Sequence, residues 1–169
     1  MNFIKKDISE LNENFVKLIS KDWMLITTPD GEKVNTMTAS WGGVGELWSK
    51  HASFAFVRPS RDTFELLEKS DKYVLNFLKE GNRDILNYCG RVSGRDVNKP
   101  EETGLVPLEY ENGVYVFNQT KYAFVCRKMY SQDLKEKSFI SPEAAKHAYP
   151  QGDIHRMYIG EIEYVLVSE

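Results

Sequence analysis

The chain has 169 residues, a length that suits one domain of ordinary size. Hydrophobic residues make up 41% of it and charged residues 28%, which excludes collagen-like, low-complexity and disordered proteins, because those lack the apolar content that offsets chain entropy. The 22 basic and 25 acidic residues give a net charge of −3, so the sequence has no basic field for nucleic acid and no strong attraction to anionic lipid.

The apolar runs of the chain are short. The longest, such as 53–57 and 122–126, fall far short of the ~20 residues that a membrane-spanning helix needs. No apolar run and no small-residue cleavage site follow the first lysines, so we expect no secretory signal and a cytoplasmic protein. Cys89 and Cys126 lie too far apart for a CxxC motif and are expected to be free thiols in a reducing compartment.

The first part of the chain predicts a helix followed by a β-hairpin. Apolar side chains recur at intervals of three and four over residues 7–20, which is typical of a short amphipathic helix with Asp7 or Ser9 as its N-cap. Residues 23–28 predict a strand, and residues 29–31 (Pro-Asp-Gly) predict a turn into a second strand. Proline presets φ in such a turn, and glycine accepts positive φ.

The middle of the chain predicts strands that alternate with helices. The predicted elements are strands over 51–58 and 72–78 and helices over 64–68 and 81–88. Pro59 ends the first strand, Ser60 or Asp62 is expected to cap the first helix, and Asn82 to cap the second. Residues 89–104, rich in glycine and polar residues, predict a long loop, which in a compact domain is either functional or mobile.

The last part of the chain predicts three strands and a partly helical connection. The strands are expected over 113–118, 122–130 and 157–167, and the connection over 133–148. No segment repeats and no linker divides the chain, so residues 1–169 are expected to form a single domain. The pattern predicts a mainly β protein with added helices, built as a closed or partly closed antiparallel barrel.

Residues 35–43 have a composition suited to ligand binding. Four small polar residues lie beside Trp41 and two glycines, so hydroxyl and backbone N–H groups can face an anionic or heteroaromatic ligand. A Thr/Ser-rich strand followed by a turn explains the same residues without any ligand.

Residues 58–63 join a strand end to a helix start. Arg58, Arg61, two hydroxyl groups and the N–H groups of a helix N-terminus meet there, a combination that suits phosphate. A capped helix with surface arginines is the alternative, since such caps are common without a ligand.

Two further segments carry weaker signals. Residues 89–99 hold cations and glycines that can wrap a phosphate, but their spacing matches no nucleotide-binding fingerprint, and a mobile charged loop is the alternative. Cys89 is either a thiol acidified by nearby Arg91 or a small core residue. His155 precedes the last strand, where a pocket rim or a structural turn is expected. The three histidines lack metal-ligand spacing, so no metal site is expected.

Four separated motifs, in order from about residue 23 to residue 165, together resemble one family. They are TTPDGEKVNTMTASWGG, FAFVRPSRDTFELLEKSDKYVLNFL, CGRVSGRDVNK and GDIHRMYIGEIEYV. The chain resembles the flavin reductase-like proteins with an FMN-binding split β-barrel, the group that includes flavoredoxin. The resemblance implies a six-stranded antiparallel split β-barrel of Greek-key arrangement, assembled as a homodimer with FMN held noncovalently near the interface.

The resemblance also implies roles for individual residues. Residues 36–41 match the segment that lines the isoalloxazine and ribityl chain, and residues 58–63 match the phosphate-binding segment. His155 is implied as the catalytic residue beside the flavin face. The implied cofactor-binding residues are Thr36, Met37, Thr38, Ala39, Ser40, Trp41, Arg58, Ser60, Arg61, Thr63, Asn76, Phe77, Cys89, Ser93 and Lys99.

These assignments lead to three hypotheses of function. The first is an oxidoreductase that passes hydride or electrons from NADH or NADPH through FMN to a flavin or a redox protein partner. The second is a flavin-binding electron carrier without its own nicotinamide site, and the third is a structural module without a ligand. The sequence holds no nicotinamide-specific fingerprint that would select the donor.

Overall fold

The computed structural model describes residues 2–30, 33–111 and 113–169. The strands are β1 (Phe3–Lys6), β2 (Met24–Asp30), β3 (Lys33–Ala39), β4 (Gly42–Leu47), β5 (Lys50–Val57), β6 (Lys72–Leu78), β7 (Pro107–Glu111), β8 (Val114–Phe117), β9 (Thr120–Asp133) and β10 (Arg156–Ser168). The helices are α1 (Phe15–Lys17), α2 (Asp62–Lys69), α3 (Arg83–Arg91), α4 (Lys99–Thr103) and α5 (Pro142–Ala148). None of the described helices has the length and apolar character needed to cross a membrane.

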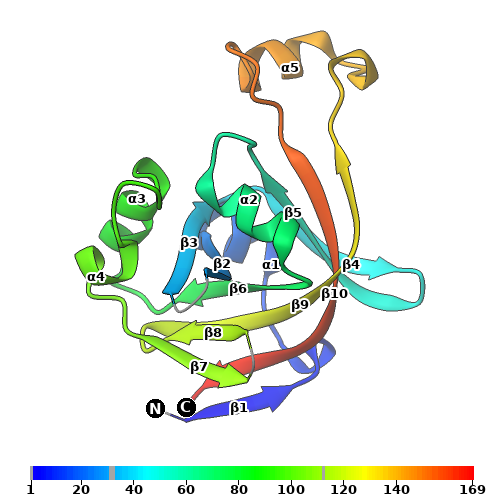
Figure 1. The fold of residues 1–169 in the computed structure, drawn as a ribbon. Helices are drawn as coiled ribbons and strands as arrows, with labels where there is room; N and C mark the ends of the chain where they lie inside the picture. The colour runs from blue at the N-terminus through cyan, green and yellow to red at the C-terminus, as the bar shows by residue number, and fades with distance from the viewer. Residues whose placement is uncertain (1, 31–32, 112) are drawn as a thin grey trace.

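An eight-stranded antiparallel sheet forms most of the molecule (Figure 1). Its hydrogen-bonded path runs β3-β2-β6-β9-β10-β5-β4, and β1 pairs with the second half of β10, beyond the part that pairs with β5. The prediction of a mainly β antiparallel fold with helices is therefore confirmed. The predicted count of six strands is wrong, because the sheet has eight. β3 and β4 lie at the two ends of its path and do not pair with each other in the described residues.

Three strands, β1, β4 and β7, were not expected from the sequence. Their sequences FIKK, GGVGEL and PLEYE lack a buried apolar run. They form because β10, β5 and β8 each offer backbone donors and acceptors along an edge. Partner strands decide these elements, and local propensity does not.

The remaining predicted strands are confirmed. β5, β6, β8, β9 and β10 fall on the predicted ranges, with β9 and β10 longer than expected. The β2-β3 hairpin also forms, with Thr28 opposite Asn35, although Gly31 of its predicted turn lies outside the described residues.

The core lies on both faces of the sheet. On β6, Tyr73, Leu75 and Phe77 belong to the large cluster on one face, whereas Val74 packs on the other face with residues of β8. Burial on both faces explains why residues 72–78 form a nearly continuous apolar run and not an alternating one.

The prediction of one continuous helix over residues 7–20 is wrong. The segment forms a 3₁₀ turn over Ile8–Glu10, then α1, then a π turn over Leu18–Asp22, with non-helical residues before α1. Asp7 caps only the first turn, and the Asn14 side chain starts a new one by accepting a hydrogen bond from the Lys17 N–H at 3.0 Å. Two N-caps within eight positions divide the segment.

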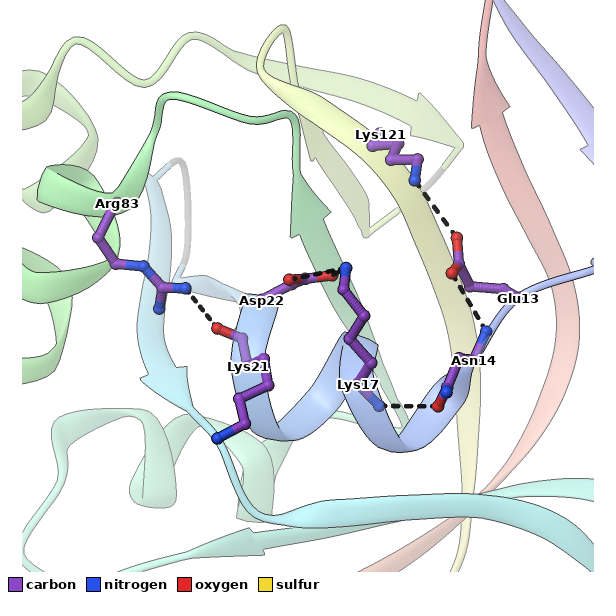
Figure 2. Close-up of polar contacts among 7 residues, drawn as sticks. All are labelled: Glu13, Asn14, Lys17, Lys21, Asp22, Arg83 and Lys121. Atoms are coloured by element: carbon purple, nitrogen blue, oxygen red, sulfur yellow. Dashed lines mark hydrogen bonds and ion pairs between the residues drawn. The ribbon is translucent and has the colours of Figure 1, made fainter.

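Contacts with distant parts of the chain hold this divided segment in place (Figure 2). Lys121 on β9 places Nζ 3.3 Å from the carboxylate of Glu13. The guanidinium of Arg83, at the start of α3, donates to the carbonyl oxygen of Lys21. Tertiary contacts therefore fix the segment where local helix propensity does not.

The loop predicted over residues 89–104 is helical at both ends. α3 continues to Arg91 because Cys89 is buried in a cluster with Leu86 and Phe117. α4 begins after Asn98 with Pro100 in its first turn. Proline is tolerated there because the N–H groups of a helix's first turn have no acceptor within the helix. Residues 92–98 and Gly104 remain without helix.

Candidate functional site

A pocket of about 190 Å³ opens where the ends of β3 and β5 meet the start of β10. We call it the β3–β5 pocket. It is lined by Met37, Thr38, Ala39, Ser40, Trp41, Phe56, Arg58, Arg61 and His155. All of these except Phe56 are in the set predicted from the sequence. Phe56 could have been found from its position two residues before Arg58, since alternate residues of a strand share a face.

β3 divides its side chains between the pocket and the neighbouring elements. The Thr36 hydroxyl is buried, donates to the Ile26 carbonyl oxygen at 3.2 Å, and is absent from the pocket lining. The Thr38 hydroxyl donates to the Leu86 carbonyl oxygen at 2.6 Å, which ties β3 to α3. These two hydroxyl groups therefore fix β3 against its neighbours. This agrees with the alternative interpretation of residues 35–43 as a Thr/Ser-rich strand that needs no ligand.

Arg58 joins the end of β5 to residues 134–155, the segment between β9 and β10 that carries α5 (Figure 1). Its Nη1 donates to the Asp153 carbonyl oxygen at 3.3 Å and its Nη2 to the Ala148 carbonyl oxygen at 3.1 Å. The guanidinium carbon lies 5.1 Å from the centroid of the Tyr149 ring, within the range of a cation–π contact. Arg58 thereby holds this segment beside the pocket.

Arg61 joins the start of α2 to the last turn of α3. Its Nη1 donates to the Gly90 carbonyl oxygen at 2.7 Å and its Nη2 to the Cys89 carbonyl oxygen at 2.9 Å. A cation at the C-terminal carbonyls of a helix is favourable both as a hydrogen-bond donor and toward the helix dipole. Burial lowers the pKa of the guanidinium, which nevertheless stays charged at neutral pH.

The N-cap predicted for α2 at Ser60 or Asp62 is wrong. Arg61 occupies the N-cap position without a side-chain cap hydrogen bond. Ser60 instead binds the carboxylate of Asp153, with the Ser60 hydroxyl 2.6 Å from Oδ2 and the Ser60 N–H group 3.1 Å from Oδ1. Asp62 accepts a hydrogen bond from the side-chain amide of Asn35. Tertiary partners have taken the side chains that would otherwise cap the helix.

Thr63 stands out in the first turn of α2. Its side chain is buried, with 1% relative exposure, and its hydroxyl oxygen has no hydrogen-bond partner among the described residues. A buried hydroxyl without a partner is costly, and Thr63 does not line the β3–β5 pocket.

His155 is held in one orientation at the pocket wall. Its Nδ1 lies 2.9 Å from the Tyr149 hydroxyl oxygen, and its ring centroid lies 5.2 Å from that of Trp41. Burial, and then the charge of Arg58, lower the pKa of His155 to about 4, although Asp153 opposes the shift. The imidazole is therefore neutral at pH 7.

We expect His155 to stay neutral down to about pH 5, as NMR titration of its imidazole will measure. Because the folded pKa of about 4 lies below the ordinary 6.5, the unfolded chain binds the proton first as the pH falls. The contribution of this group to stability is complete above pH 6.5 and is lost between there and about pH 4. A titration midpoint between pH 6 and 7 would show instead that water reaches the ring.

Lys99 is buried behind the pocket and does not line it. Its Nζ donates to the Thr36 carbonyl oxygen at 2.8 Å and lies 3.3 Å from the Cys89 carbonyl oxygen, which also accepts from Arg61. Burial and the nearby Arg61 lower the pKa of Lys99 to about 8. Lys99 lines a second, polar pocket of about 260 Å³ instead.

Cys89 and Ser93 also lie outside the pocket lining. Burial raises the pKa of the Cys89 thiol to about 11, so the hypothesis of an acidified thiol is wrong and the small core residue is confirmed. Both Cys89 and Cys126 are buried free thiols. The Ser93 hydroxyl accepts from the Arg95 N–H group at 3.2 Å and shapes the loop before α4.

Asn76 and Phe77 lie on β6, away from the β3–β5 pocket. The Asn76 amide donates to the Thr27 hydroxyl at 3.0 Å, and its oxygen accepts from the Thr120 hydroxyl at 3.0 Å. Phe77 packs in the core, 4.9 Å from Phe124 between ring centroids. The structure therefore gives these two predicted residues partners inside the fold.

The described residues offer no metal centre. Within them, no three His, Cys, Asp or Glu side chains gather as metal ligands.

Comparison with solved structures gives the same fold in several flavoproteins. Flavoredoxin from Methanosarcina acetivorans superposes with a TM-score of 0.71 at 18% identity, covering 97% of this chain and 76% of that chain. Flavoredoxin of Desulfovibrio vulgaris (Miyazaki F) gives 0.68 at 18% identity, covering 98% and 78%. A Streptomyces globisporus NADH:FAD oxidoreductase gives 0.64 at 13% identity, covering 87% and 76%.

Comparison of the sequence with protein-family models identifies the family of the chain. No curated protein matches the sequence. The family described as "Flavin reductase like domain" matches residues 16–169, which include every residue of the β3–β5 pocket. The protein therefore belongs to the flavin reductase-like family.

Proposed function

We propose that this protein binds FMN in the β3–β5 pocket, with the phosphate at residues 58–63, and uses it as an oxidoreductase. One observation carries the proposal: the aromatic rings of Trp41 and Phe56 line the same pocket as the guanidinium groups of Arg58 and Arg61. A flavin mononucleotide needs both, a flat apolar surface for its ring and charge-assisted donors for its phosphate.

The donors near α2 fit a phosphate group. Arg61 has five N–H donors, of which the Cys89 and Gly90 carbonyl oxygens occupy two. The backbone N–H groups of Asp62 and Thr63, the first two of α2, have no partner within the helix. Together these groups supply donors of the kind that phosphate accepts.

The size of the pocket supports a site completed by a second copy of the chain. At about 190 Å³ it is smaller than the ~300–1,000 Å³ of pockets that enclose a whole ligand. An apolar hollow of about 400 Å³ adjoins it at Ser40 and Trp41, and Val16 at its rim is 77% exposed. A homodimer that covers this surface would also cover the ring side of the ligand.

The chain's own residues would orient the flavin and exclude water. When bound, the isoalloxazine ring accepts hydride and passes the electrons onward, so no protein group has to be reduced. Trp41 offers a half-exposed ring face, and neutral His155, fixed by Tyr149, offers its second ring nitrogen as a hydrogen-bonding group. Because its pKa is about 4, His155 positions and does not transfer a proton near neutral pH.

The electron donor proposed is NADH or NADPH, and the acceptor a free flavin or a redox protein. The alternative is a flavin-binding electron carrier without a nicotinamide site. One structural relative, from Streptomyces globisporus, is an NADH:FAD oxidoreductase, which favours the enzyme.

An absorbance spectrum of the purified protein tests the proposal. We expect bands of bound flavin, FMN as the main cofactor released by heat, and bleaching by NADH or NADPH under anaerobic conditions. Bleaching by dithionite alone would favour the electron carrier. FAD as the main released cofactor, or no flavin binding at micromolar concentrations, would contradict the proposed site.

Replacing His155 by alanine should slow flavin reduction by about tenfold or less while leaving FMN content unchanged, since one hydrogen bond of about 1 kcal/mol is lost. Stopped-flow absorbance measures the rate. His147→Ala, an exposed histidine on α5, is the matched control and should leave the rate unchanged. Complete loss of reduction with FMN still bound would show a larger role for His155, and an unaltered rate would show a structural one.

We expect a homodimer at tens of micromolar, measured by light scattering. Val16→Asp should shift the protein toward monomer, because it places a charge in the apolar hollow beside Trp41. A wild-type monomer that still holds flavin would contradict a site shared between two copies.

A further inference from the structure

The carboxylate of Asp153 lies at Ser60, within the segment 58–63 that we propose as the phosphate site. It lies in the segment between β9 and β10. Its Oδ2 is 2.6 Å from the Ser60 hydroxyl oxygen and its Oδ1 is 3.1 Å from the Ser60 backbone nitrogen. Two donors of residues 58–63 therefore bind an anion that belongs to the chain itself.

Two arginines of the β3–β5 pocket lie near enough to interact with Asp153, although neither forms an ion pair with its carboxylate among the described residues. Arg58 donates to its carbonyl oxygen at 3.3 Å. The charge of Asp153 also acts to raise the pKa of both Arg61 and His155, two residues that line the β3–β5 pocket. The Ser60 hydroxyl and N–H groups cannot bind this carboxylate and a phosphate dianion at full strength, because like charges at close range repel.

The contact between the Asp153 carboxylate and Ser60 can open at little cost. Asp153 has a φ of 57° and follows Gly152 at 78°, so two left-handed residues in succession form the turn before β10. Aspartate tolerates this conformation better than most residues. The Ser60 contact is solvent-exposed, so water can replace its hydrogen bonds at little cost.

We infer that Asp153 is a specificity-determining residue whose carboxylate competes with the ligand's phosphate for the Ser60 donors. It lowers the affinity for a phosphorylated flavin and leaves the affinity for the unphosphorylated flavin unchanged. This inference rests on the proposed function and sets how far the site favours FMN over riboflavin.

Titration of apoprotein with FMN and with riboflavin, followed by flavin fluorescence, tests the inference. Asp153→Gly removes the carboxylate and keeps the left-handed backbone free of strain. We expect about tenfold tighter FMN binding, as for the loss of one close like-charge contact, with riboflavin binding unchanged. Asp153→Asn, which removes the charge but keeps an acceptor oxygen, should show a smaller gain. Asp71→Asn, at an exposed aspartate between α2 and β6, controls for net charge and should show no gain.

FMN binding to Asp153→Gly that is unchanged or weaker, with riboflavin binding intact, would overturn the inference and leave the proposed function standing. If no variant binds either flavin, the proposed function fails, and inorganic phosphate then decides the inference by ³¹P NMR. Phosphate bound more tightly by Asp153→Gly than by the wild type supports the competition, and equal binding overturns it.

Discussion

Replacing Arg61 by alanine is expected to weaken FMN binding by about 10- to 100-fold, the cost of one charge-assisted contact to a phosphate. The variant also leaves the Gly90 and Cys89 carbonyl oxygens without their donor, so α3 loses its tie to α2. We therefore expect a lower melting temperature as well. Fluorescence titration gives the dissociation constant, and circular dichroism gives the melting curve.

Two comparisons separate the two roles of Arg61, which are binding the phosphate and holding α3 in place. If its guanidinium binds phosphate, FMN affinity falls more than riboflavin affinity, whereas a role only in placing α3 weakens both equally. Arg61→Lys keeps the charge but loses the fork of donors, so it should recover part of the FMN affinity. Arg91→Ala, an exposed arginine in the last turn of α3, is the charge control. An unchanged FMN dissociation constant in Arg61→Ala would remove Arg61 from the site.

Replacing Gly160 by alanine should lower the free energy of unfolding by about 2 to 3 kcal/mol, through overpacking of the core. A Cβ atom at this position of β10 would lie 2.5 Å from the Tyr73 hydroxyl oxygen and 2.9 Å from Cζ of the same ring. Tyr73 cannot withdraw easily, because its ring is buried and its hydroxyl lies 2.7 Å from the Ser53 hydroxyl. Urea denaturation measures the loss.

A double-mutant cycle tests this cause. Tyr73→Phe removes the atom nearest to the new methyl group, so Gly160→Ala should cost less in that background than in the wild type. Gly45→Ala on β4 is the matched control, since a Cβ there meets only a Phe54 ring atom at 3.9 Å. Equal costs in both backgrounds would mean that the strain does not come from Tyr73.

Several features of the candidate site could be predicted from local sequence. Arg58 and Arg61 stand at a strand-to-helix junction, and Pro59 marks the end of β5, so the place of the junction follows from residue type. The partners of these arginines do not follow from it. Gly90 and Asp153 are distant in the chain, and only the packing of α3 and of the 134–155 segment brings their oxygen atoms to the guanidinium groups.

The sequence by itself determined seven of the ten described strands and the β2-β3 hairpin, because apolar runs and turn residues are local signals. Most of the pocket lining was implied by the resemblance of four motifs to a known family. Only the tertiary structure decided that β1 and β4 extend the sheet to eight strands, that Asn76 turns its amide to Thr27, and that Asp153 binds Ser60. Strand pairing and hydrogen bonding between residues far apart in the chain depend on which surfaces meet on folding, and no local pattern encodes that meeting.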